Sequence, residues 1–408
     1  MDRRHRIRPR EARGSALRAG PVIALLLAAL VLLAAPAALA AGHRATPKPW
    51  TVMVYLDGDN NLEDYVVKDI ETELSALGSN ASVNVVVLAD RGPGYDTSRG
   101  DWQTTKLFYC TQGMLADAAS AVADWGERDM GDPRTLVDFV TYVKANYPAT
   151  NYLLAFWDHG YMTFQGYTSR DDTSGGDALD EDEQVTAMSA VGPVSVVAWD
   201  MCNRQMLEVG ADWQPFAAAM AGSESYTNWE GIQYDAVIAA IRATPTMTPQ
   251  QVGDKVAATA LGDSDTFSSV ALDGRFTTLM SAVDQWAAAL QTGLPLYRSD
   301  YLSARRNTVS YYSVAFDLWQ LAYNVKAKVA DATIKARCDA VMSAAAACTT
   351  FNWTSRNKQF SSSKGLMVWM PSTRQQLTPY SATDFTYYRT LRLCTQTRWD
   401  EFLAALCQ

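Results

Sequence analysis

Histidine is scarce in this chain of 408 residues. The three histidines are His5, His43 and His159, and the first two lie in N-terminal segments that we expect outside the folded body. A single remaining imidazole and the lack of any Cys-x-x-Cys pair exclude a conventional structural zinc centre. The sequence also lacks a repeat with a fixed period of about 20–50 residues, which excludes a solenoid or a propeller.

Positive charge is sparse beyond the N-terminus. The formal charge of the chain is −9, and the first forty residues contribute +5, so the remaining 368 residues carry −14. They contain no basic stripe, and because neutralising phosphates requires clustered Lys and Arg, nucleic-acid binding is excluded. Hydrophobic residues make up 48% of the chain and charged residues 19%, which supplies a substantial core and excludes a mainly disordered protein.

Only one long apolar run occurs, and it is short for a membrane span. Residues 21–35 (PVIALLLAALVLLAA) follow an arginine-rich segment and precede Ala38-Leu39-Ala40. This order is typical of a signal peptide cleaved after Ala40, whereas an uncleaved anchor, the alternative, needs about 20 apolar residues. We therefore expect residues 1–40 to be a signal peptide and 41–48 a leader. The protein is expected to be secreted or periplasmic, with no stable membrane span after signal removal.

Cysteine is present at six positions, and export makes disulfides the expected state. The six are Cys110, Cys202, Cys338, Cys348, Cys394 and Cys407. The last four can be bridged in more than one pattern, and the sequence leaves the pairing open. Setting Cys202 aside leaves an odd number, and we expect Cys110 to be the free thiol.

Four short apolar runs have the composition of buried parallel strands. They occupy residues 50–56, 83–89, 151–157 and 194–199. Helical stretches are expected at 62–77 and 133–147, and residues 101–109 alternate like an edge or antiparallel strand. Strands alternating with helices predict an α/β fold, a mainly parallel sheet with helices on both faces. In such sheets the functional residues follow the C-terminal ends of strands, which here directs attention to residues 57–61, 158–160 and 200–202.

The residues beyond this core predict a C-terminal α+β region, 262–408. Strands are expected at 267–272, 311–318 and 366–370, with a long alanine-rich helix at 321–348 and a last helix at 398–405. No sharp Pro/Ser/Gly linker separates this region from residues 49–261. We therefore expect it to extend the first sheet or to pack beside it.

His159 and Cys202 hold equivalent places, each just after a predicted buried strand. If the two strands are neighbours, both side chains emerge at the same edge of the sheet. An imidazole can take the proton of a thiol and later return it to a leaving amine, so the pair predicts a nucleophile and a base. The backbone N–H groups of Gly160 and Cys202 would suit an oxyanion hole. The alternative is a capping histidine and a buried structural cysteine.

Two motifs around this pair resemble a known family. Residues 156–160 (FWDHG) and 199–202 (WDMC), with Met206 and Glu208 downstream, are similar to the histidine motif and the D-x-C motif of the clostripain family of cysteine peptidases. Further similar segments are Val54-Tyr55, Asp59–Glu63, Ser223-Glu224, Glu230–Tyr234, Phe316–Leu318, Gly365–Pro371 and Trp399–Leu403. The resemblance extends over nearly the whole mature chain.

The resemblance implies a caspase-like fold, with residues 49–261 as the catalytic domain, and hydrolysis of protein or peptide substrates after Arg or Lys. It implies that His159 and Cys202 are the catalytic dyad and that Asp200 lies at the base of the S1 pocket. Glu230 matches a second acidic pocket position where the family usually has aspartate. A carboxylate can pair with either basic side chain. The alternatives are a turn or cap role for Asp200 and an exposed loop carboxylate for Glu230.

The sequence departs from the family pattern at two places beside the site. Tyr161-Met162 follow the histidine motif in place of small residues and tryptophan, and Asn203-Arg204 follow Cys202 in place of Leu-Met. These departures bear on specificity more than on the chemistry.

The segment between the dyad members is acidic, and we expect it to be exposed and mobile. Arg170 is its only basic residue. Because clostripain relatives are often activated by cleavage in this connection, Arg170–Asp171 is predicted to be a self-cleavage site. No cofactor is expected to be required. The acidic cluster could bind calcium, as some relatives do, although no EF-hand spacing occurs and a solvated acidic loop is the alternative.

Two other functions compete with an endopeptidase specific for Arg or Lys. One is a non-catalytic caspase-like module that binds basic peptides or a surface partner. The other is a peptidase with the same dyad and a different P1 preference.

Overall fold

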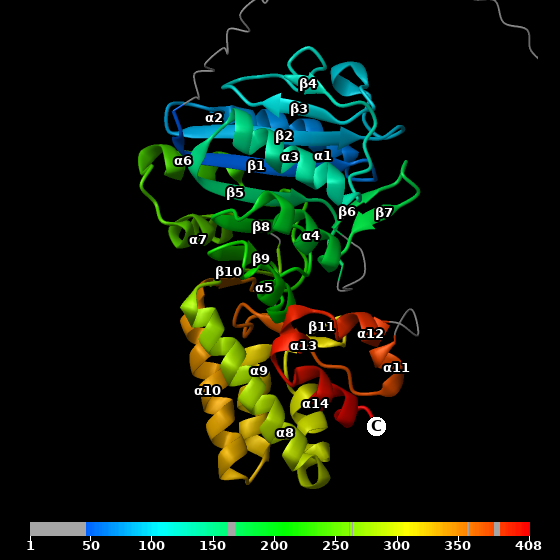
Figure 1. The fold of residues 1–408 in the computed structure, drawn as a ribbon, viewed down its shortest axis with the longest axis vertical. Helices are drawn as coiled ribbons and strands as arrows, with labels where there is room; N and C mark the ends of the chain where they lie inside the picture. Colours follow the sequence, from blue (N-terminus) through cyan, green and yellow to red (C-terminus); the bar gives the residue numbers. More distant parts are fainter. Residues whose placement is uncertain (1–45, 162–167, 261, 263, 357–358, 379–383) are drawn as a thin grey trace, which may run out of the picture. The chain divides into compact units, whose positions relative to one another are not determined.

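A nine-stranded sheet forms the centre of the computed structural model (Figure 1). The structure describes residues 46–161, 168–260, 262, 264–356, 359–378 and 384–408. The predicted signal peptide lies outside the described residues, as do residues 41–45 of the predicted leader. Within the described ranges, no helix combines the length and the apolar character that crossing a membrane requires.

Five strands in the middle of the sheet run parallel, β2, β1, β5, β8 and β9, with antiparallel strands on either side. In sheet order the nine strands are β13 Thr349–Thr354, β10 Thr266–Ala271, β9 Ala219–Gly222, β8 Val196–Asp200, β5 Ala149–Trp157, β1 Lys48–Gly58, β2 Val83–Arg91, β3 Lys106–Tyr109 and β4 Ala123–Asp124. The four predicted buried strands are confirmed, because each consists mainly of apolar residues that are buried on both faces. The segment predicted at 101–109 contributes β3, which is antiparallel to β2 and is covered at the edge by the short β4.

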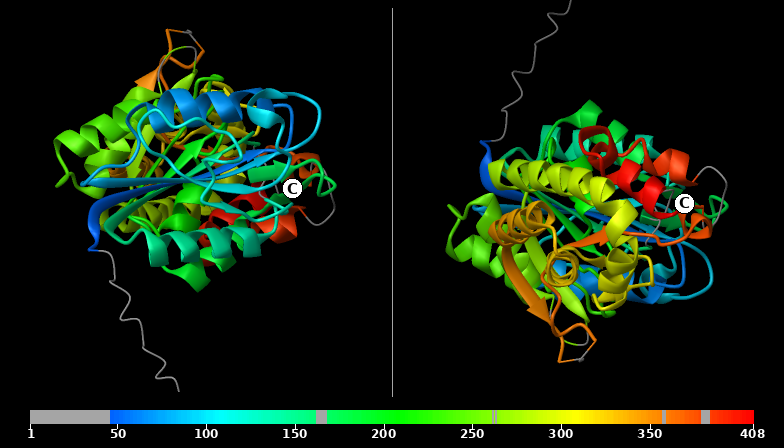
Figure 2. Two further views of the ribbon diagram at one scale, coloured as in Figure 1. Left: turned by 90° about the horizontal axis from the view of Figure 1, so that it is seen from above. Right: turned by 90° about the horizontal axis from the view of Figure 1, so that it is seen from below.

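Helices cover both faces of the sheet, as Figure 2 shows for α1 and α3 on opposite sides. On one face lie α1 Glu63–Asp69, the π-helical stretch η1 Ile70–Leu74, α2 Ser75–Leu77, α6 Tyr234–Ala243 and α7 Pro249–Thr259. On the other lie α3 Pro133–Asn146, α4 Glu181–Val191 and α5 Leu207–Trp213. The pleat of β1 separates the two cores, since Val52 and Val54 belong to the first and Met53 and Tyr55 to the second.

The C-terminal region was expected either to extend the first sheet or to pack beside it, and its strands divide between two sheets. Strands β10 and β13 extend the main sheet, and a second sheet packs beside it with strands β11 Ser310–Tyr311, β12 Ala315–Asp317 and β14 Met367–Trp369. The helices of this region are α8 Gly274–Arg306, α9 Leu318–Lys328, α10 Ala332–Cys348, α11 Arg374–Leu377, α12 Asp384–Tyr388, α13 Arg392–Gln396 and α14 Trp399–Leu406. The described residues from 46 onward form one compact unit, and the main sheet continues across the expected boundary at 261–262.

Two predicted elements of this region were wrong. The single helix expected at 321–348 is interrupted, because Val329 is extended and the Asp331 side chain caps a new helix by accepting a hydrogen bond from Ile334 N. The single strand expected at 311–318 is a hairpin of β11 and β12. Tyr312 and Ser313 turn the chain there with φ values of 48° and 64°.

The cysteines also differ from expectation, because all six are free thiols. Five of them are buried among apolar side chains, and Cys202 is half-buried. Cys338 and Cys348 lie on the same helix, α10, where they pack in the core as small hydrophobic residues. The expectations that Cys110 and Cys202 are free agree with the structure.

The acidic connection is ordered over the part that the structure describes. Residues 168–179 form a hairpin of β6 Thr168–Asp171 and β7 Asp177–Leu179, and α4 follows directly, with a capping box between Asp180 and Glu183. The expectation of a mobile segment is therefore wrong for residues 168–201. Residues 162–167 of the connection lie outside the described residues.

Candidate active site

The pairing of β5 with β8 brings the predicted dyad to one edge of the sheet. The two strands are parallel neighbours, and Trp157 is opposite Asp200 in the register. The loops that follow are in close contact, because a Cβ atom added to Gly160 would lie 1.9 Å from the Cys202 carbonyl oxygen. Only glycine fits at position 160 with this backbone approach.

A single pocket contains three of the six predicted site residues, His159, Asp200 and Cys202. Its lining comprises Leu62, Tyr65, Trp157, Asp158, His159, Asp200, Met201, Cys202, Tyr226, Thr227, Asn228, Trp229 and Gly231. The pocket lies beyond the carboxyl ends of β1, β5 and β8, where the chain order in the sheet switches direction. Tyr65 and Trp229 stack on each other at 5.6 Å between ring centroids. His159, Cys202 and Asp200 are thus brought together.

Asn61 orients the imidazole, a role that sequence reasoning did not assign. Its Oδ1 lies 2.9 Å from His159 Nε2. Because an amide oxygen only accepts hydrogen bonds, Nε2 carries the proton and Nδ1 is the basic nitrogen of the neutral ring. Burial, followed by the charge of Arg170, lowers the pKa of His159 below its ordinary value. The sequence could have indicated this role, because Asn61 lies just beyond the end of β1, at the same edge of the sheet as His159.

Cys202 is held as a neutral thiol. Its Sγ accepts a hydrogen bond from Thr227 N at 3.4 Å. Burial raises the pKa of Cys202 above its ordinary value, and this effect outweighs the backbone hydrogen bond, which acts in the opposite direction. Together with the lowered pKa of His159, this favours an uncharged thiol and imidazole over a thiolate–imidazolium pair.

Of the two predicted oxyanion donors, Cys202 lines the pocket, and Gly160 lies against the backbone of Cys202, outside the lining. Among the described residues, the N–H groups of Gly160 and Cys202 donate no hydrogen bond to a partner. The Gly160 carbonyl instead accepts from Asn203 Nδ2 at 3.4 Å, which links the loops after β5 and β8. Two free N–H groups near a nucleophile are the arrangement that stabilises a developing oxyanion.

Asp200 is buried with one oxygen uncompensated. Its Oδ1 accepts from Ile232 N at 3.0 Å, and its Oδ2 has no hydrogen-bond partner among the described residues. Burial raises the pKa of Asp200 to about 7, and this effect outweighs the Ile232 N–H and the nearby Tyr234 hydroxyl, which act in the opposite direction. The backbone of Gly231 comes so close that an added Cβ would lie 2.2 Å from Oδ1, and its φ is 55°. Glycine at 231 therefore lets the chain wrap around this carboxyl group.

Two further buried carboxyl groups lie near Asp200 and were missed from the sequence. Asp69 Oδ2 accepts from Trp157 Nε1 at 2.8 Å, and Glu73 Oε2 accepts from Tyr234 N at 3.1 Å. Burial raises the pKa of Asp69 to about 8, with a further contribution from the charge of Asp200. Burial, with the charge of Asp69, raises the pKa of Glu73 to about 9. The sequence could have indicated this pair, because Asp69 and Glu73 are four positions apart and therefore lie on the same face of a helix.

Glu230 and Arg170 lie outside the pocket lining. Glu230 is exposed and directly precedes the pocket residue Gly231. Arg170 lies in β6, where its backbone N–H donates to Asp158 Oδ2 at 2.6 Å and its carbonyl accepts from Asn60 Nδ2 at 3.2 Å. The structure thus brings Arg170 close to the loop of His159 without placing it at Cys202.

The two residues that depart from the family pattern after Cys202 have structural roles here. Asn203 adopts a φ of 61°, a conformation that asparagine tolerates better than leucine. Arg204 is buried, pairs with Glu181 at the start of α4, and lies 5.0 Å from the ring centroid of Trp199. The Arg204 guanidinium therefore faces the core and neutralises a carboxylate of the connection.

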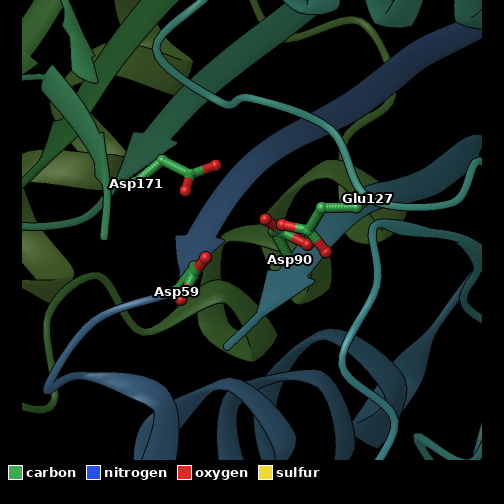
Figure 3. A group of neighbouring side chains, drawn as sticks. All are labelled: Asp59, Asp90, Glu127 and Asp171. Atoms are coloured by element: carbon green, nitrogen blue, oxygen red, sulfur yellow. The ribbon is translucent and has the colours of Figure 1, made fainter. Parts of the chain in front are cut away.

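The residues that could hold a metal ion form a separate group of four carboxylates (Figure 3): Asp59, Asp90, Glu127 and Asp171. It lies at the ends of β1 and β2 and includes none of the pocket residues.

A thiol and an imidazole at adjacent strand ends of a caspase-like sheet are the arrangement of a cysteine peptidase. A sequence model of the clostripain family (Peptidase_C11) matches residues 54–405, and the chain belongs to this family. It is 27% identical to clostripain of Hathewaya histolytica over 221 residues. The matched segment covers 47% of this chain and 42% of clostripain, so it spans less than half of that relative.

Two solved structures share the fold. A secreted C11 cysteine protease from Bacteroides thetaiotaomicron, solved with an irreversible peptide inhibitor, is 15% identical with a TM-score of 0.64, covering 86% of this chain and 99% of that chain. An inactive zymogen C11 protease from Parabacteroides distasonis is 16% identical with a TM-score of 0.60, covering 89% and 99%. At these identities the likeness shows the caspase-like fold alone.

The neutral state of the dyad predicts how Cys202 reacts with an alkylating agent. We expect the rate with iodoacetamide to rise with pH, with a midpoint above the ordinary thiol value of about 8.5, because burial disfavours the thiolate. Mass spectrometry of Cys202 alkylation between pH 5 and pH 10 measures this, with Cys202→Ala reporting the background of the buried thiols. A rate that is already maximal at pH 6 would indicate an ion pair with His159 instead.

Proposed function

We propose that this protein is an exported cysteine endopeptidase that hydrolyses peptide bonds after Arg or Lys. The observation that carries the proposal is the composition of one pocket. It contains a thiol, an imidazole oriented by an amide, and a buried carboxylate oxygen that lacks a partner. Family membership supports a peptidase, and the uncompensated carboxylate supports a cationic P1 side chain.

The proposed reaction has the following proton balance. Cys202 Sγ attacks the scissile carbonyl carbon while its proton passes to His159 Nδ1, and the developing oxyanion accepts from the N–H groups of Gly160 and Cys202. The C–N bond then breaks, the imidazolium returns the proton to the leaving amine, and a thioester remains on Sγ. Water, activated by the neutral imidazole, hydrolyses this thioester and regenerates the thiol. Asn61 keeps the ring oriented throughout.

Specificity for a basic side chain is assigned chiefly to Asp200. Asp200 lines the pocket, where an incoming guanidinium or ammonium group would supply the charge that its carboxylate lacks. Asp69 and Glu73 add negative potential behind the pocket, since they can ionise when a cation enters. Glu230, exposed beside Gly231, is proposed to contact the basic group at the mouth of the pocket.

Export is part of the proposal and rests on the sequence of residues 1–40. Their basic segment, apolar run and small-residue cleavage site support a signal peptide removed after Ala40. The related Bacteroides protease is described as secreted, which agrees with this assignment.

Self-processing at Arg170 is proposed to require opening of the β6–β7 hairpin. The Arg170 carbonyl is engaged by Asn60, and the carboxylate of Asp171, buried at 0% exposure, accepts from Met130 N and Ser174 N. A peptide bond held in this way cannot reach Cys202. Arg170 is still the only basic residue of the connection, and therefore the only site there that fits the proposed specificity.

Replacement of the nucleophile tests the activity. Wild-type protein is expected to cleave fluorogenic peptides with Arg or Lys at P1 under reducing conditions, and Cys202→Ala is expected to fall to the uncatalysed background because no thioester can form. Circular dichroism of both proteins controls for folding. Equal silence of the two proteins on every peptide, with and without calcium, would favour the non-catalytic module.

Replacement of the pocket carboxylate tests the specificity. Asp200→Asn is expected to lower kcat/KM for basic P1 residues by about 100-fold or more, because the cation loses its buried partner, and to change neutral P1 substrates little. Asp212→Asn, a buried aspartate on α5 that accepts from Arg392 N, is the matched control. An equal loss on basic and neutral substrates would contradict the assignment and favour a different P1 preference.

N-terminal sequencing tests the processing. A new terminus at Asp171 is expected in purified wild-type protein and not in Cys202→Ala, because the cut depends on the chain's own thiol. The amount of product is expected to increase under mild destabilisation, since the hairpin must open first. A terminus at Asp171 in both proteins would exclude self-processing, and its absence from both would exclude cleavage at this bond.

A further inference from the structure

Two large aromatic side chains are exposed at the mouth of the active-site pocket. Tyr226 is 38% exposed and Trp229 is 51% exposed, and both line the pocket together with Cys202. Trp229 is the only tryptophan among the exposed large hydrophobic residues of the part of the chain that the structure describes. Aromatic surface left in water beside a pocket is typical of a ligand contact, because binding removes that apolar area from water.

A tight turn and a neighbouring helix hold Trp229 in this position. Gly231 N donates to the Asn228 carbonyl at 3.1 Å and to Asn228 Oδ1 at 3.0 Å. Trp229 and Glu230 are therefore the two central residues of a β-turn. The indole ring also stacks on Tyr65 of α1, with 5.6 Å between the ring centroids and 14° between the planes. The exposed ring is thus fixed before any substrate arrives.

The two stacked rings come from opposite walls of the pocket. Tyr65 lies on α1, four residues before the buried Asp69, and Trp229 lies two residues before Gly231, whose backbone wraps around Asp200. The rings are therefore beside the path that leads from the surface to the carboxyl groups at the base.

The order of the strands decides which part of a substrate passes these rings. In the sheet, β8 lies between β5 and β9, so the loop of Cys202 is flanked by the loop of His159 on one side and by residues 223–231 on the other. In the proposed reaction His159 returns a proton to the leaving amine, so the leaving part of the substrate lies on the side of His159. The acyl part, which stays bonded to Cys202 Sγ, then extends over residues 223–231.

We propose that Tyr65, Tyr226 and Trp229 form an aromatic subsite for an apolar side chain at P2, the substrate residue directly before the basic one. In the proposed function, on which this inference rests, the P1 side chain extends toward Asp200 at the base of the pocket. The next residue of the acyl part is the first that can meet the rings at the mouth. Aromatic faces bind aliphatic and aromatic side chains by burying apolar area on both partners.

The charged groups nearest to the rings give an acidic P2 side chain as the competing occupant. Lys68 Nζ lies 5.6 Å from the ring centroid of Tyr65, whereas Glu230 shares the turn of Trp229 and has the opposite charge. Both charged residues are exposed, so solvent screens them. Apolar burial therefore outweighs charge at this surface.

Binding to the Cys202→Ala full chain tests the subsite without turnover. The probes are three acetylated tripeptide amides, Ala-Leu-Arg, Ala-Gly-Arg and Ala-Asp-Arg, which differ only at P2 and end at P1. Isothermal titration calorimetry measures their dissociation constants. The leucine peptide is expected to bind about tenfold or more tightly than the glycine peptide, because only leucine buries an apolar side chain against the rings.

Variants of the exposed tryptophan assign this preference to the subsite. Trp229→Ala is expected to reduce the preference for leucine to about twofold or less, and Trp229→Phe is expected to retain most of it because an aromatic face remains. Tyr323→Ala is the matched control, since Tyr323 is 54% exposed and stacks on Trp319 at 5.6 Å, outside the pocket lining. Circular dichroism of each variant separates a lost contact from lost folding.

Three results would overturn the subsite. They are equal binding of the leucine and glycine peptides, a preference for leucine that Trp229→Ala leaves unchanged, and tightest binding of the aspartate peptide, which would assign P2 selection to Lys68.

A fourth peptide, Ala-Leu-Ala, separates failure of the subsite from failure of the proposed function. Loss of the P2 preference while arginine is still required at P1 would remove the subsite and leave the function standing. Binding of Ala-Leu-Ala as tight as that of Ala-Leu-Arg would contradict the basic P1 specificity instead. If none of the peptides binds, the subsite fails, and turnover of a fluorogenic Ala-Leu-Arg substrate by the wild type then decides the peptidase function.

Discussion

The parallel pairing of β5 with β8 is the constraint on which the site depends. With Trp157 opposite Asp200, the residues that follow the two strands leave the sheet at the same level. Gly160 then allows its loop to lie against the backbone of Cys202, and any side chain at that position would separate the loops. The imidazole, the thiol and two free N–H groups are thus placed by backbone geometry, before any side chain adjusts.

Burial, more than charge pairing, sets the chemical state of this site. Desolvation keeps the Cys202 thiol and the His159 imidazole neutral, and it raises the pKa of Asp200 to about 7. A substrate that brings a cation to Asp200 would stabilise the ionised carboxylate. The scissile carbonyl carbon of that substrate would then be attacked by Cys202 Sγ. The resting site therefore has little charge of its own, and each ionisation is coupled to occupancy by substrate.

The sequence predicted the elements whose conformation follows from their own residue pattern. It missed the breaks and turns that depend on how distant parts of the chain pack together. Strands such as β2 were recognisable because apolar, β-branched residues are buried on both faces. The break between α9 and α10 was hidden in an alanine-rich segment, and the turn at Tyr312-Ser313 uses positive φ values without glycine. In the site, the strand ends located His159 and Cys202. The contribution of Asp69 became visible only once η1 and α1 were packed against the sheet.

Carboxyl groups are concentrated on both sides of the loop that follows β1. Asp200, Asp69 and Glu73 lie on the pocket side, and Asp59, Asp90, Glu127 and Asp171 on the other. Each buried carboxylate raises the free energy of the empty protein unless it binds a proton or a cation, so each group selects for a positive ligand. Asn60 contacts Asp158 and Asn61 contacts His159, so the loop that follows Asp59 adjoins both groups.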